Sequence, residues 1–273
     1  MREAGVDKAA GVLEIGPGIG PLTSELAKRA GKVVSIELDK SLLPVLAETM
    51  APYPNVEIVP GDAMKLDLNT LVEEKFQGLT PIVCANLPYN ITTPILEKLI
   101  QTPAIQTVTV LIQKEVAQRI AAEPGSADYS AFTVFCQYYA EPELLFDVPA
   151  HCFLPQPKVT SAVIQLKVRK ERNWDILDEK TFFRTVRAAF AQRRKTLVNS
   201  LAAAFPQMEK EHSRDAIVRC GLPETVRGEK LGLPELAELG LNGLHFTDVI
   251  TITVPQFCFS EDHPCDLAKG IRL

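Results

Sequence analysis

Short apolar runs alternate with amphipathic segments through the first part of the chain. The apolar runs lie at 12–15, 33–36, 56–59, 82–85 and 108–112. Runs of this kind are typical of strands that are buried on both faces of a sheet. Segments of helical periodicity separate them, at 21–29, 41–50, 94–100 and 114–122. The alternation predicts a doubly wound α/β fold with a parallel sheet, in which ligands bind at the carboxyl ends of the strands.

The pattern changes from Glu143 onward. Residues 144–148 and 159–166 read as two strands on either side of a proline-rich loop, which predicts an antiparallel hairpin at the edge of the sheet. Helical periodicity follows Lys170. The apolar residues of one stripe are Phe183, Val186, Phe190, Leu197 and Leu201. We therefore expect one helix from Phe183 to Leu201, with basic residues on its flanks.

Two further short helices are expected at 208–220 and 234–239. These segments predict an α/β domain over residues 1–170, a small helical domain over 171–240 and an atypical tail over 241–273. Residues 245–254 of the tail alternate like a strand without an evident partner, and we assign the tail no role.

The net charge of −5 is unevenly distributed. Residues 1–150 carry 11 Lys and Arg against 19 Asp and Glu, a net −8. Residues 151–215 carry 13 against 7, a net +6, and residues 216–273 carry 5 against 8, a net −3. A basic segment after an acidic domain predicts a phosphate-binding footprint, and a solvated helix face is the alternative.

Composition excludes several other classes. The chain is 46% hydrophobic and 23% charged, as expected for a globular protein. It has no apolar stretch long enough to span a bilayer and no signal peptide, so we expect a cytoplasmic protein. The six cysteines have no ligand spacing and the four histidines are scattered, so we expect reduced thiols and no metal site.

Three glycines, Gly16, Gly18 and Gly20, lie between the first predicted strand and the first predicted helix. Glycines there let the backbone approach a ligand at the amino end of the helix. The dinucleotide fingerprint requires a glycine at position 21, which is Pro21. The spacing GxGxG after Glu14 suits a smaller ligand with an amino-acid moiety, and S-adenosylmethionine fits. A purely structural tight turn explains the glycines about equally well.

Acidic residues follow the next two strands. Glu37 ends the second strand, where a carboxylate can accept hydrogen bonds from both ribose hydroxyls, and Leu38 follows it at the same cofactor site. Asp62 ends the third strand and can accept from an adenine amino group, while the Ala63 N–H donates to a ring nitrogen. A capping role is the equal alternative for Asp62, and the expected role for Asp39.

The fourth strand ends in Asn86-Leu87-Pro88-Tyr89. This arrangement suits methylation of an exocyclic amino group. The Asn86 side-chain oxygen and the Leu87 carbonyl can each accept a hydrogen bond from one amino nitrogen, which holds it and withdraws its lone pair from conjugation. Pro88 stiffens the turn, and Tyr89 offers a face on which a base can stack. We expect Asn86 to contact the cofactor as well as the target base.

Taken together, the motifs at four successive strand ends resemble those of class I S-adenosylmethionine-dependent methyltransferases of the adenine-N6 type. Later segments resemble the ribosomal RNA adenine dimethyltransferases. These segments are 113–119, Pro124-Gly125, Phe153-Leu-Pro-Gln-Pro-Lys-Val159 with the following 160–163, and the expected helix with Arg193-Arg-Lys-Thr-Leu197. The match runs from about Val12 to Leu239 and favours the small-subunit dimethyladenosine transferase branch.

The resemblance implies a Rossmann-like class I methyltransferase fold with an antiparallel edge hairpin, followed by a small all-α domain. It implies that S-adenosylmethionine donates two methyl groups to N6 of each of two adjacent adenosines in a loop near the 3′ end of small-subunit rRNA. The implied partner is a precursor of the 30S subunit, and we expect a monomer. Such a target base must leave its stack to reach the donor.

The resemblance also places the target adenine between Tyr89 and Phe153. For Phe153 the alternative is an aromatic side chain that only packs within the loop. Asn86, Leu87, Pro88, Tyr89 and Phe153 are therefore the expected catalytic residues. The expected RNA contacts are basic residues of the proline-rich loop and of the expected helix. They are Lys158, Arg184, Arg187, Arg193, Arg194 and Lys195.

The family pattern has a further amino-terminal segment with a Gln-Asn-Phe-Leu motif, which helps to close over the cofactor. Only 2–11 precede the first strand here, so we expect this lid segment to be absent. Three alternatives stay open. They are a large-subunit RNA methylase of the erythromycin-resistance type, a non-catalytic nucleic-acid-binding or assembly protein on the same fold, and a Rossmann oxidoreductase, which Pro21 and the unused Asn-Leu-Pro-Tyr disfavour.

Overall fold

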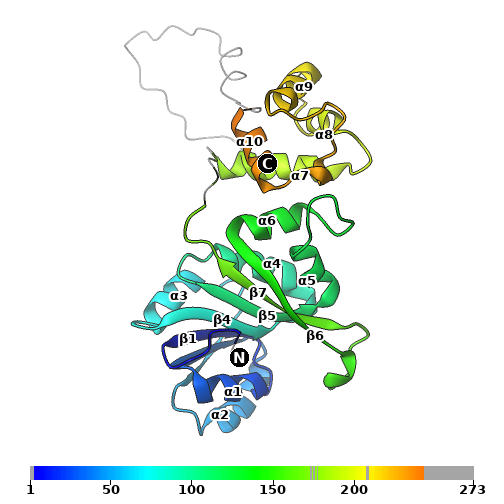
Figure 1. The fold of residues 1–273 in the computed structure, drawn as a ribbon. Coiled ribbons are helices and arrows are strands. Elements are labelled where there is room, and N and C mark those ends of the chain that lie inside the picture. Colours follow the sequence, from blue (N-terminus) through cyan, green and yellow to red (C-terminus); the bar gives the residue numbers. More distant parts are fainter. Residues whose placement is uncertain (1–2, 173, 175, 177, 207–208, 243–273) are drawn as a thin grey trace, which may run out of the picture.

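The computed structural model describes residues 3–172, 174, 176, 178–206 and 209–242. A seven-stranded sheet forms its centre, with strand order β3-β2-β1-β4-β5-β7-β6 (Figure 1). The strands are β1 (Ala10–Ile15), β2 (Lys32–Glu37), β3 (Val56–Pro60), β4 (Thr80–Asn86), β5 (Thr107–Gln113), β6 (Ala140–Val148) and β7 (Ser161–Val168). The strands β1 to β5 are parallel, and β7 runs antiparallel to β5 and β6. The predicted parallel sheet with an antiparallel edge hairpin is confirmed.

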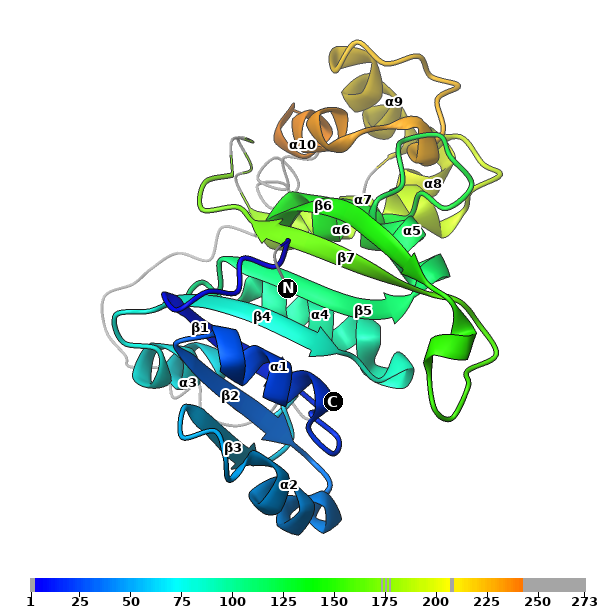
Figure 2. The same ribbon diagram turned by 60° about the horizontal axis from the view of Figure 1, so that its bottom comes forward.

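The structure describes ten helices, of which the first six cover the faces of this sheet. They are α1 (Pro21–Arg29), α2 (Leu43–Met50), α3 (Leu68–Lys75), α4 (Thr92–Gln101), α5 (Lys114–Ile120), α6 (Ala131–Tyr139), α7 (Glu179–Ala191), α8 (Leu197–Ala204), α9 (Lys210–Arg219) and α10 (Leu233–Asn242). Short 3₁₀ turns lie at Lys40–Leu42, Tyr89–Ile91, Ala150–Cys152 and Gly228–Lys230. Figure 2 shows α1 in front of the sheet, with α4 behind it.

Alternate residues of β1 face opposite sides of the sheet, and both sides are buried. Val12 belongs to a small core with Leu26 of α1. Leu13 belongs to a larger core that includes Ile95 of α4. These side chains are fully buried, which explains why the strands read as continuous apolar runs and not as an alternation.

Two helices, α3 and α6, were not predicted from the sequence. The helix α6 is apolar on several sides because it lies between the sheet and α7, so its sequence shows no single stripe. Its start is nevertheless marked by a capping box, in which the Ser130 hydroxyl accepts from the Thr133 N–H and the Thr133 hydroxyl accepts from the Ser130 N–H. A Thr in place of the usual Glu or Gln made this signal easy to miss.

The single helix expected from Phe183 to Leu201 is wrong. The structure has α7 and α8, separated by an exposed turn at 192–195 and Thr196. The turn is fixed by tertiary hydrogen bonds, because the Leu197 N–H donates to the Val226 carbonyl at 2.7 Å and the Arg193 side chain bonds to other segments. Periodicity could not reveal the break, since the five residues from Gln192 to Thr196 are all polar and carry no apolar phase. The expected helices near 208–220 and 234–239 are confirmed as α9 and α10.

An aromatic cluster joins the α/β part of the chain to α7. Tyr138 and Tyr139 at the end of α6 pack against Phe182 and Phe183 of α7, with ring centroids 5.2 to 5.9 Å apart. Both tyrosine hydroxyls donate to the Glu179 carboxylate at 2.9 Å. One hydrophobic core therefore runs from the sheet into α7 to α10, which lie beyond α6 in both views (Figures 1 and 2).

The division into domains at 1–170 and 171–240 stays a prediction. The tail at 241–273, with its strand-like stretch at 245–254, lies almost wholly outside the described residues. Within the described part of the chain, no helix is long and apolar enough to cross a membrane.

Candidate active site

The glycine turn after β1 is built from backbone that other residues rarely adopt. Gly16, Gly18 and Gly20 have φ values of +68°, +61° and +93°, in the left-handed region that favours glycine. A Cβ on Gly20 would lie 2.6 Å from the end of the Met50 side chain. Gly16 also binds the next strand, because its N–H donates to the Ile36 carbonyl at 3.0 Å. The turn therefore lets the backbone come close to a ligand at the carboxyl ends of β1 and β2.

Glu14 lies beneath this turn and is 1% exposed. Its Oε2 accepts hydrogen bonds from the Thr23 hydroxyl at 2.7 Å and the Ser35 hydroxyl at 2.6 Å. Burial raises the pKa of the Glu14 carboxyl, against the effect of these two hydrogen bonds. In this structure Glu14 connects β1, α1 and β2, and it does not line the adjacent cavity. Its contact with the cofactor stays a prediction.

A cavity of about 230 Å³ opens at the carboxyl ends of β1, β2 and β3. These strand ends supply three groups of its lining residues. The residues are Ile15 and Gly16, Ile36 to Asp39, and Gly61 to Ala63, with Pro88 and Ile91 on a further side. Of the residues predicted for the cofactor, Gly16, Glu37, Leu38, Asp62 and Ala63 are brought together here, whereas Gly18 and Gly20 do not line the cavity.

Glu37 is 6% exposed in the wall of this cavity. Its Oε1 accepts from the Asp39 N–H at 2.7 Å, and its Oε2 accepts no hydrogen bond from a described residue. One oxygen is thus held in place while the other is left for a ligand, which suits binding of ribose hydroxyls. Asp39 also caps the 3₁₀ turn at Lys40–Leu42, as expected, by accepting from the Ser41 N–H.

Asp62 makes a local turn at the end of β3. Its Oδ1 accepts from the Met64 N–H at 2.9 Å, and its backbone carbonyl accepts from Lys65 and Leu66. The turn expected of a capping Asp62 and its place in the cavity are thus both present, and its Oδ2 lies 3.7 Å from the Lys65 ammonium. Ala63 is buried beside it. Leu38, which is 68% exposed, adds an unusual apolar side chain to the rim of the cavity.

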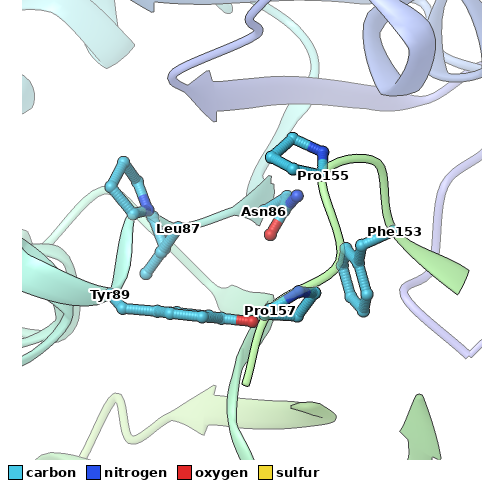
Figure 3. A pocket seen from close by; sticks show the side chains of 7 residues that line it. Asn86, Leu87, Tyr89, Phe153, Pro155 and Pro157 are labelled. Carbon is cyan, nitrogen blue, oxygen red and sulfur yellow. The ribbon is translucent and has the colours of Figure 1, made fainter. Parts of the chain in front are cut away.

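A second cavity, of about 320 Å³, lies at the end of β4 (Figure 3). Its walls come from the Asn-Leu-Pro-Tyr turn and from the loop between β6 and β7. The lining residues are Asn86, Leu87, Pro88, Tyr89, Phe153, Pro155 and Pro157. All five residues predicted to be catalytic are therefore in one pocket, although 64 positions separate Tyr89 from Phe153 in the sequence. The prolines at 155 and 157 were not predicted; Leu154-Pro155 is a cis peptide bond.

The pocket holds two hydrogen-bond acceptors without partners. Neither the Asn86 side chain nor the Leu87 carbonyl bonds to another described residue. The Leu87 N–H, by contrast, donates to the Leu111 carbonyl of β5 at 3.2 Å, which fixes the turn to the sheet. In Figure 3 the Asn86 amide lies between the Tyr89 ring and the loop of Phe153 and Pro155. These acceptors suit an amino group with two N–H donors.

Pro88 lines both cavities. It also approaches the glycine turn, because a Cβ on Gly16 would lie 3.9 Å from the Pro88 ring. A ligand on the strand ends and a base in the second pocket would thus meet at Pro88. This adjacency is what transfer of a group from one to the other requires.

Tyr89 has a partner that the sequence did not suggest. Its hydroxyl lies 2.7 Å from the hydroxyl of Ser161, the first residue of β7, and Ser161 is fully buried. The two residues are 72 positions apart in the sequence, so no local signal could have paired them.

The basic residues predicted to contact RNA fall into two groups. The side chains of Lys158, Arg187, Arg194 and Lys195 are exposed and make no hydrogen bond or ion pair with other residues that the structure describes. Arg193 instead pairs with Glu229 at 3.0 Å and donates to the Ala127 carbonyl at 3.0 Å. It therefore holds the α5–α6 loop against the turn at Gly228–Lys230.

Arg184 also serves within the fold. Its guanidinium lies 4.4 Å from the centre of the Phe205 ring and donates to the Ala204 carbonyl at 3.2 Å. It thus connects α7 with the end of α8. No group of three or more His, Cys, Asp or Glu capable of holding a metal occurs among the described residues.

The site can now be compared with known proteins. A family profile described as "Ribosomal RNA adenine dimethylase" matches residues 1–226. The chain belongs to the ribosomal RNA adenine dimethylase family. The resemblance found in the sequence is confirmed, and with it the activity of an S-adenosylmethionine-dependent rRNA adenine methyltransferase. The oxidoreductase alternative is excluded.

Similar members of this family carry the name "Ribosomal RNA small subunit methyltransferase A". The protein from Alkaliphilus oremlandii is 43% identical over 240 residues, which cover 88% of this chain and 84% of that protein. The protein from Geobacillus thermodenitrificans is 46% identical over 240 residues, covering 86% and 82%. The protein from Listeria monocytogenes serotype 4a is 47% identical over 242 residues, again covering 86% and 82%.

Two solved structures share the fold of this dimethylase. A dimethyladenosine transferase from Plasmodium falciparum superposes with a TM-score of 0.73 at 25% identity, covering 90% of this chain and 93% of that chain. The 23S rRNA methyltransferase ErmE superposes with a TM-score of 0.66 at 26% identity, covering 89% and 94%. Both similarities extend over the sheet and the carboxyl-terminal helices, so the predicted fold class is confirmed along the chain.

Proposed function

We propose that this enzyme transfers two methyl groups to N6 of each of two adjacent adenosines in a loop near the 3′ end of small-subunit rRNA. The single observation that carries the reaction is the pair of unpartnered acceptors, Asn86 and the Leu87 carbonyl, in a pocket that adjoins the strand-end cavity at Pro88. The relatives named for the small subunit support the choice of RNA. A precursor of the 30S subunit in the cytoplasm is the proposed substrate, and the enzyme acts as a monomer.

The cofactor occupies the cavity at the ends of β1, β2 and β3. There the Glu37 Oε2 binds the ribose hydroxyls, Asp62 and the Ala63 N–H bind the adenine, and the glycine turn receives the amino-acid moiety. S-adenosylmethionine supplies a methyl group on a positively charged sulfur. The buried carboxylate of Glu37 is held by the Asp39 N–H, so its orientation is set before the ligand binds.

The chain acts mainly by holding the target nitrogen in line. The adenine stacks between Tyr89 and Phe153, and its amino group donates one hydrogen bond to Asn86 and one to the Leu87 carbonyl. These bonds draw the lone pair of N6 out of the ring and toward the methyl carbon. When bound, S-adenosylmethionine would give up its methyl group to N6 and leave as the neutral thioether, and N6 would then lose a proton. Alignment of the two reactants supplies most of the rate gain.

Four exposed cations, Lys158, Arg187, Arg194 and Lys195, form the proposed RNA footprint. Their charges are free of intramolecular partners in the described part of the chain, so they are available to phosphates. Arg184 and Arg193 are committed to contacts within the protein and are left out of this footprint.

Asn86→Ala tests the reaction. We expect a loss of about 100-fold or more in methyl transfer, because a displacement of about 1 Å in the reacting atom has an effect of that size. Binding of S-adenosylmethionine should weaken only slightly, since Asn86 lines the base pocket. The measurement is tritiated-methyl transfer to unmethylated small ribosomal subunits, with identification of the product nucleoside.

Asn90→Ala is the matched control, because Asn90 is exposed, lies four positions later and does not line the pocket. Near-normal turnover of Asn86→Ala would overturn the assignment. Methylation of large-subunit RNA in preference to small subunits would instead favour the erythromycin-resistance type of activity, to which the likeness with ErmE also points. RNA binding without any methyl transfer by the wild-type chain would favour an assembly protein.

A further inference from the structure

The hydrogen bond between Tyr89 and Ser161 joins the two sides of the base pocket. Tyr89 belongs to the turn after β4, and Ser161 begins β7 directly after the loop that carries Phe153. The two hydroxyl oxygens are 2.7 Å apart. This bond thus connects the turn that carries Tyr89 with the strand that follows the loop of Phe153.

Ser161 is a rigid point of attachment. Its backbone lies between two strands, opposite Gln113 of β5 and Val148 of β6, and its side chain is fully buried. The residue before it, Thr160, accepts a hydrogen bond from the Lys114 N–H at 3.0 Å. The Lys114 ammonium also pairs with Asp147 at 2.6 Å, so both ends of the loop are held.

Tyr89, in contrast, lies in a single 3₁₀ turn and is partly exposed. The Tyr89 ring makes no ring–ring contact with another described aromatic residue, and its hydroxyl makes its hydrogen bond to Ser161 alone among the described residues. The Ser161 hydroxyl is thus the contact that sets the direction in which the Tyr89 ring points.

We propose that Ser161 is a positioning residue, whose hydroxyl orients the Tyr89 ring and thereby the target adenine, above all in the second methyl transfer. This inference rests on the proposed function. The unmodified amino group has two N–H donors, one for Asn86 and one for the Leu87 carbonyl. After the first transfer only one N–H is left, so stacking on an oriented ring has to supply a larger share of the alignment.

Ser161→Ala should therefore change the product and not only the rate. We expect the rate constant of the second methylation to fall relative to the first by roughly 3- to 10-fold, the factor that corresponds to one typical hydrogen bond. N6-methyladenosine should accumulate where the wild type yields N6,N6-dimethyladenosine. The measurement is the time course of both nucleosides in digests of small ribosomal subunits. The two products are compared at equal total methyl incorporation, where their ratio does not depend on the amount of folded enzyme.

Three further variants separate positioning from mere packing. Tyr89→Phe keeps the ring and removes the bond, so it should give the same product ratio, and the double variant should be no worse than either single one. Ser161→Thr keeps a hydroxyl and suits a strand, so it should restore dimethylation. Ser200→Ala is the matched control, because the Ser200 hydroxyl is buried and has no hydrogen-bond partner in the described structure.

An unchanged product ratio in Ser161→Ala, with or without a lower melting temperature, would overturn the inference alone and leave Ser161 as a packing residue. Additive effects in the double variant would also overturn it, because Ser161 would then not act through Tyr89. A wild-type chain that forms no N6-methylated adenosine would instead overturn the proposed function, and this inference with it.

Discussion

Glu14 precedes the glycine turn, as the sequence motif requires, but its hydrogen bonds in the structure connect β1 with α1 and β2. It was predicted as a cofactor contact because it precedes the glycine turn. In the structure it is buried, accepts from Thr23 and Ser35, and lies behind the cavity. A carboxylate in this place ties the turn to α1 and β2, and its burial makes the charged form costly.

This predicts a pH effect on stability. Burial raises the Glu14 pKa above its ordinary value of 4.5, so the folded chain binds this proton more tightly than the unfolded chain. Below pH 4.5 the carboxyl is protonated in both the folded and the unfolded chain, so its burial does not lower the free energy of unfolding. As the pH rises toward the raised pKa, the cost of burying the charge increasingly lowers that free energy. The melting temperature of Glu14→Gln should therefore rise relative to wild type as the pH rises above 4.5.

Thermal unfolding of the cofactor-free protein over this range measures the difference. Glu48→Gln, at an exposed position of α2, is the control and should show no such trend. A constant difference between Glu14→Gln and wild type would mean that Glu14 titrates alike in the folded and unfolded chains.

At the scale of elements, the turn between α7 and α8 separates two kinds of basic residue that look alike in the sequence. Arg193 is bonded to Glu229 and to the carbonyls of the α5–α6 loop. Arg194 and Lys195, its neighbours, have no such partners within the described residues, and all three line a surface hollow of about 310 Å³. Three consecutive cations therefore divide into one structural residue and two that are available to a ligand.

Arg193→Ala should lower the melting temperature, by about 2 to 4 °C for a loss near 1 kcal/mol, because it removes the contacts between the turn and two other segments. It should leave the salt dependence of RNA binding almost unchanged. The matched variant with Arg194→Ala and Lys195→Ala should do the reverse, lowering the slope of log affinity against log salt by about 0.7 for each lost phosphate contact.

Thermal melts and RNA binding at several salt concentrations provide both readouts. Equal salt slopes in the wild type and in the Arg194 and Lys195 variant would remove this turn from the RNA footprint. A normal melting temperature for Arg193→Ala would show that its hydrogen bonds are replaced by water at no cost.

At the scale of the whole molecule, the α/β part and the helical part share their core. The tyrosines of α6, the phenylalanines of α7 and the half-exposed Glu179 carboxylate form one network, and Arg172 lies 4.8 Å from the Tyr139 ring centre. The Tyr129 hydroxyl also donates to the Leu231 carbonyl at 2.9 Å across the same junction. The hydrophobic core is thus continuous across the predicted boundary near residue 170, where the chain changes from strand to helix.

We accordingly expect the whole chain to unfold in one cooperative transition, because neither part can open without exposing the shared core. Scanning calorimetry should give a van't Hoff enthalpy equal to the calorimetric enthalpy. Two separate transitions would show instead that the helical part folds on its own, as the predicted domain boundary suggests.

The sequence by itself determined the parallel sheet, its edge hairpin and the family. Continuous apolar runs are expected only in strands that are covered on both faces. The glycine turn and Asn-Leu-Pro-Tyr indicate their chemistry through local backbone geometry. Such information is contained in neighbouring residues, so it can be read without the fold. Five of the residues that line the second cavity were likewise named in advance, through motifs that also carry the resemblance.

Only the tertiary structure decided which residues act together over long separations. It broke the expected helix at the turn of Arg193, placed Glu14 behind the cavity at the strand ends and paired Tyr89 with Ser161. Each of these outcomes depends on a hydrogen bond between segments distant in the sequence. Periodicity and spacing are local quantities and carry no record of such partners, which exist only once the sheet has brought its strand ends together.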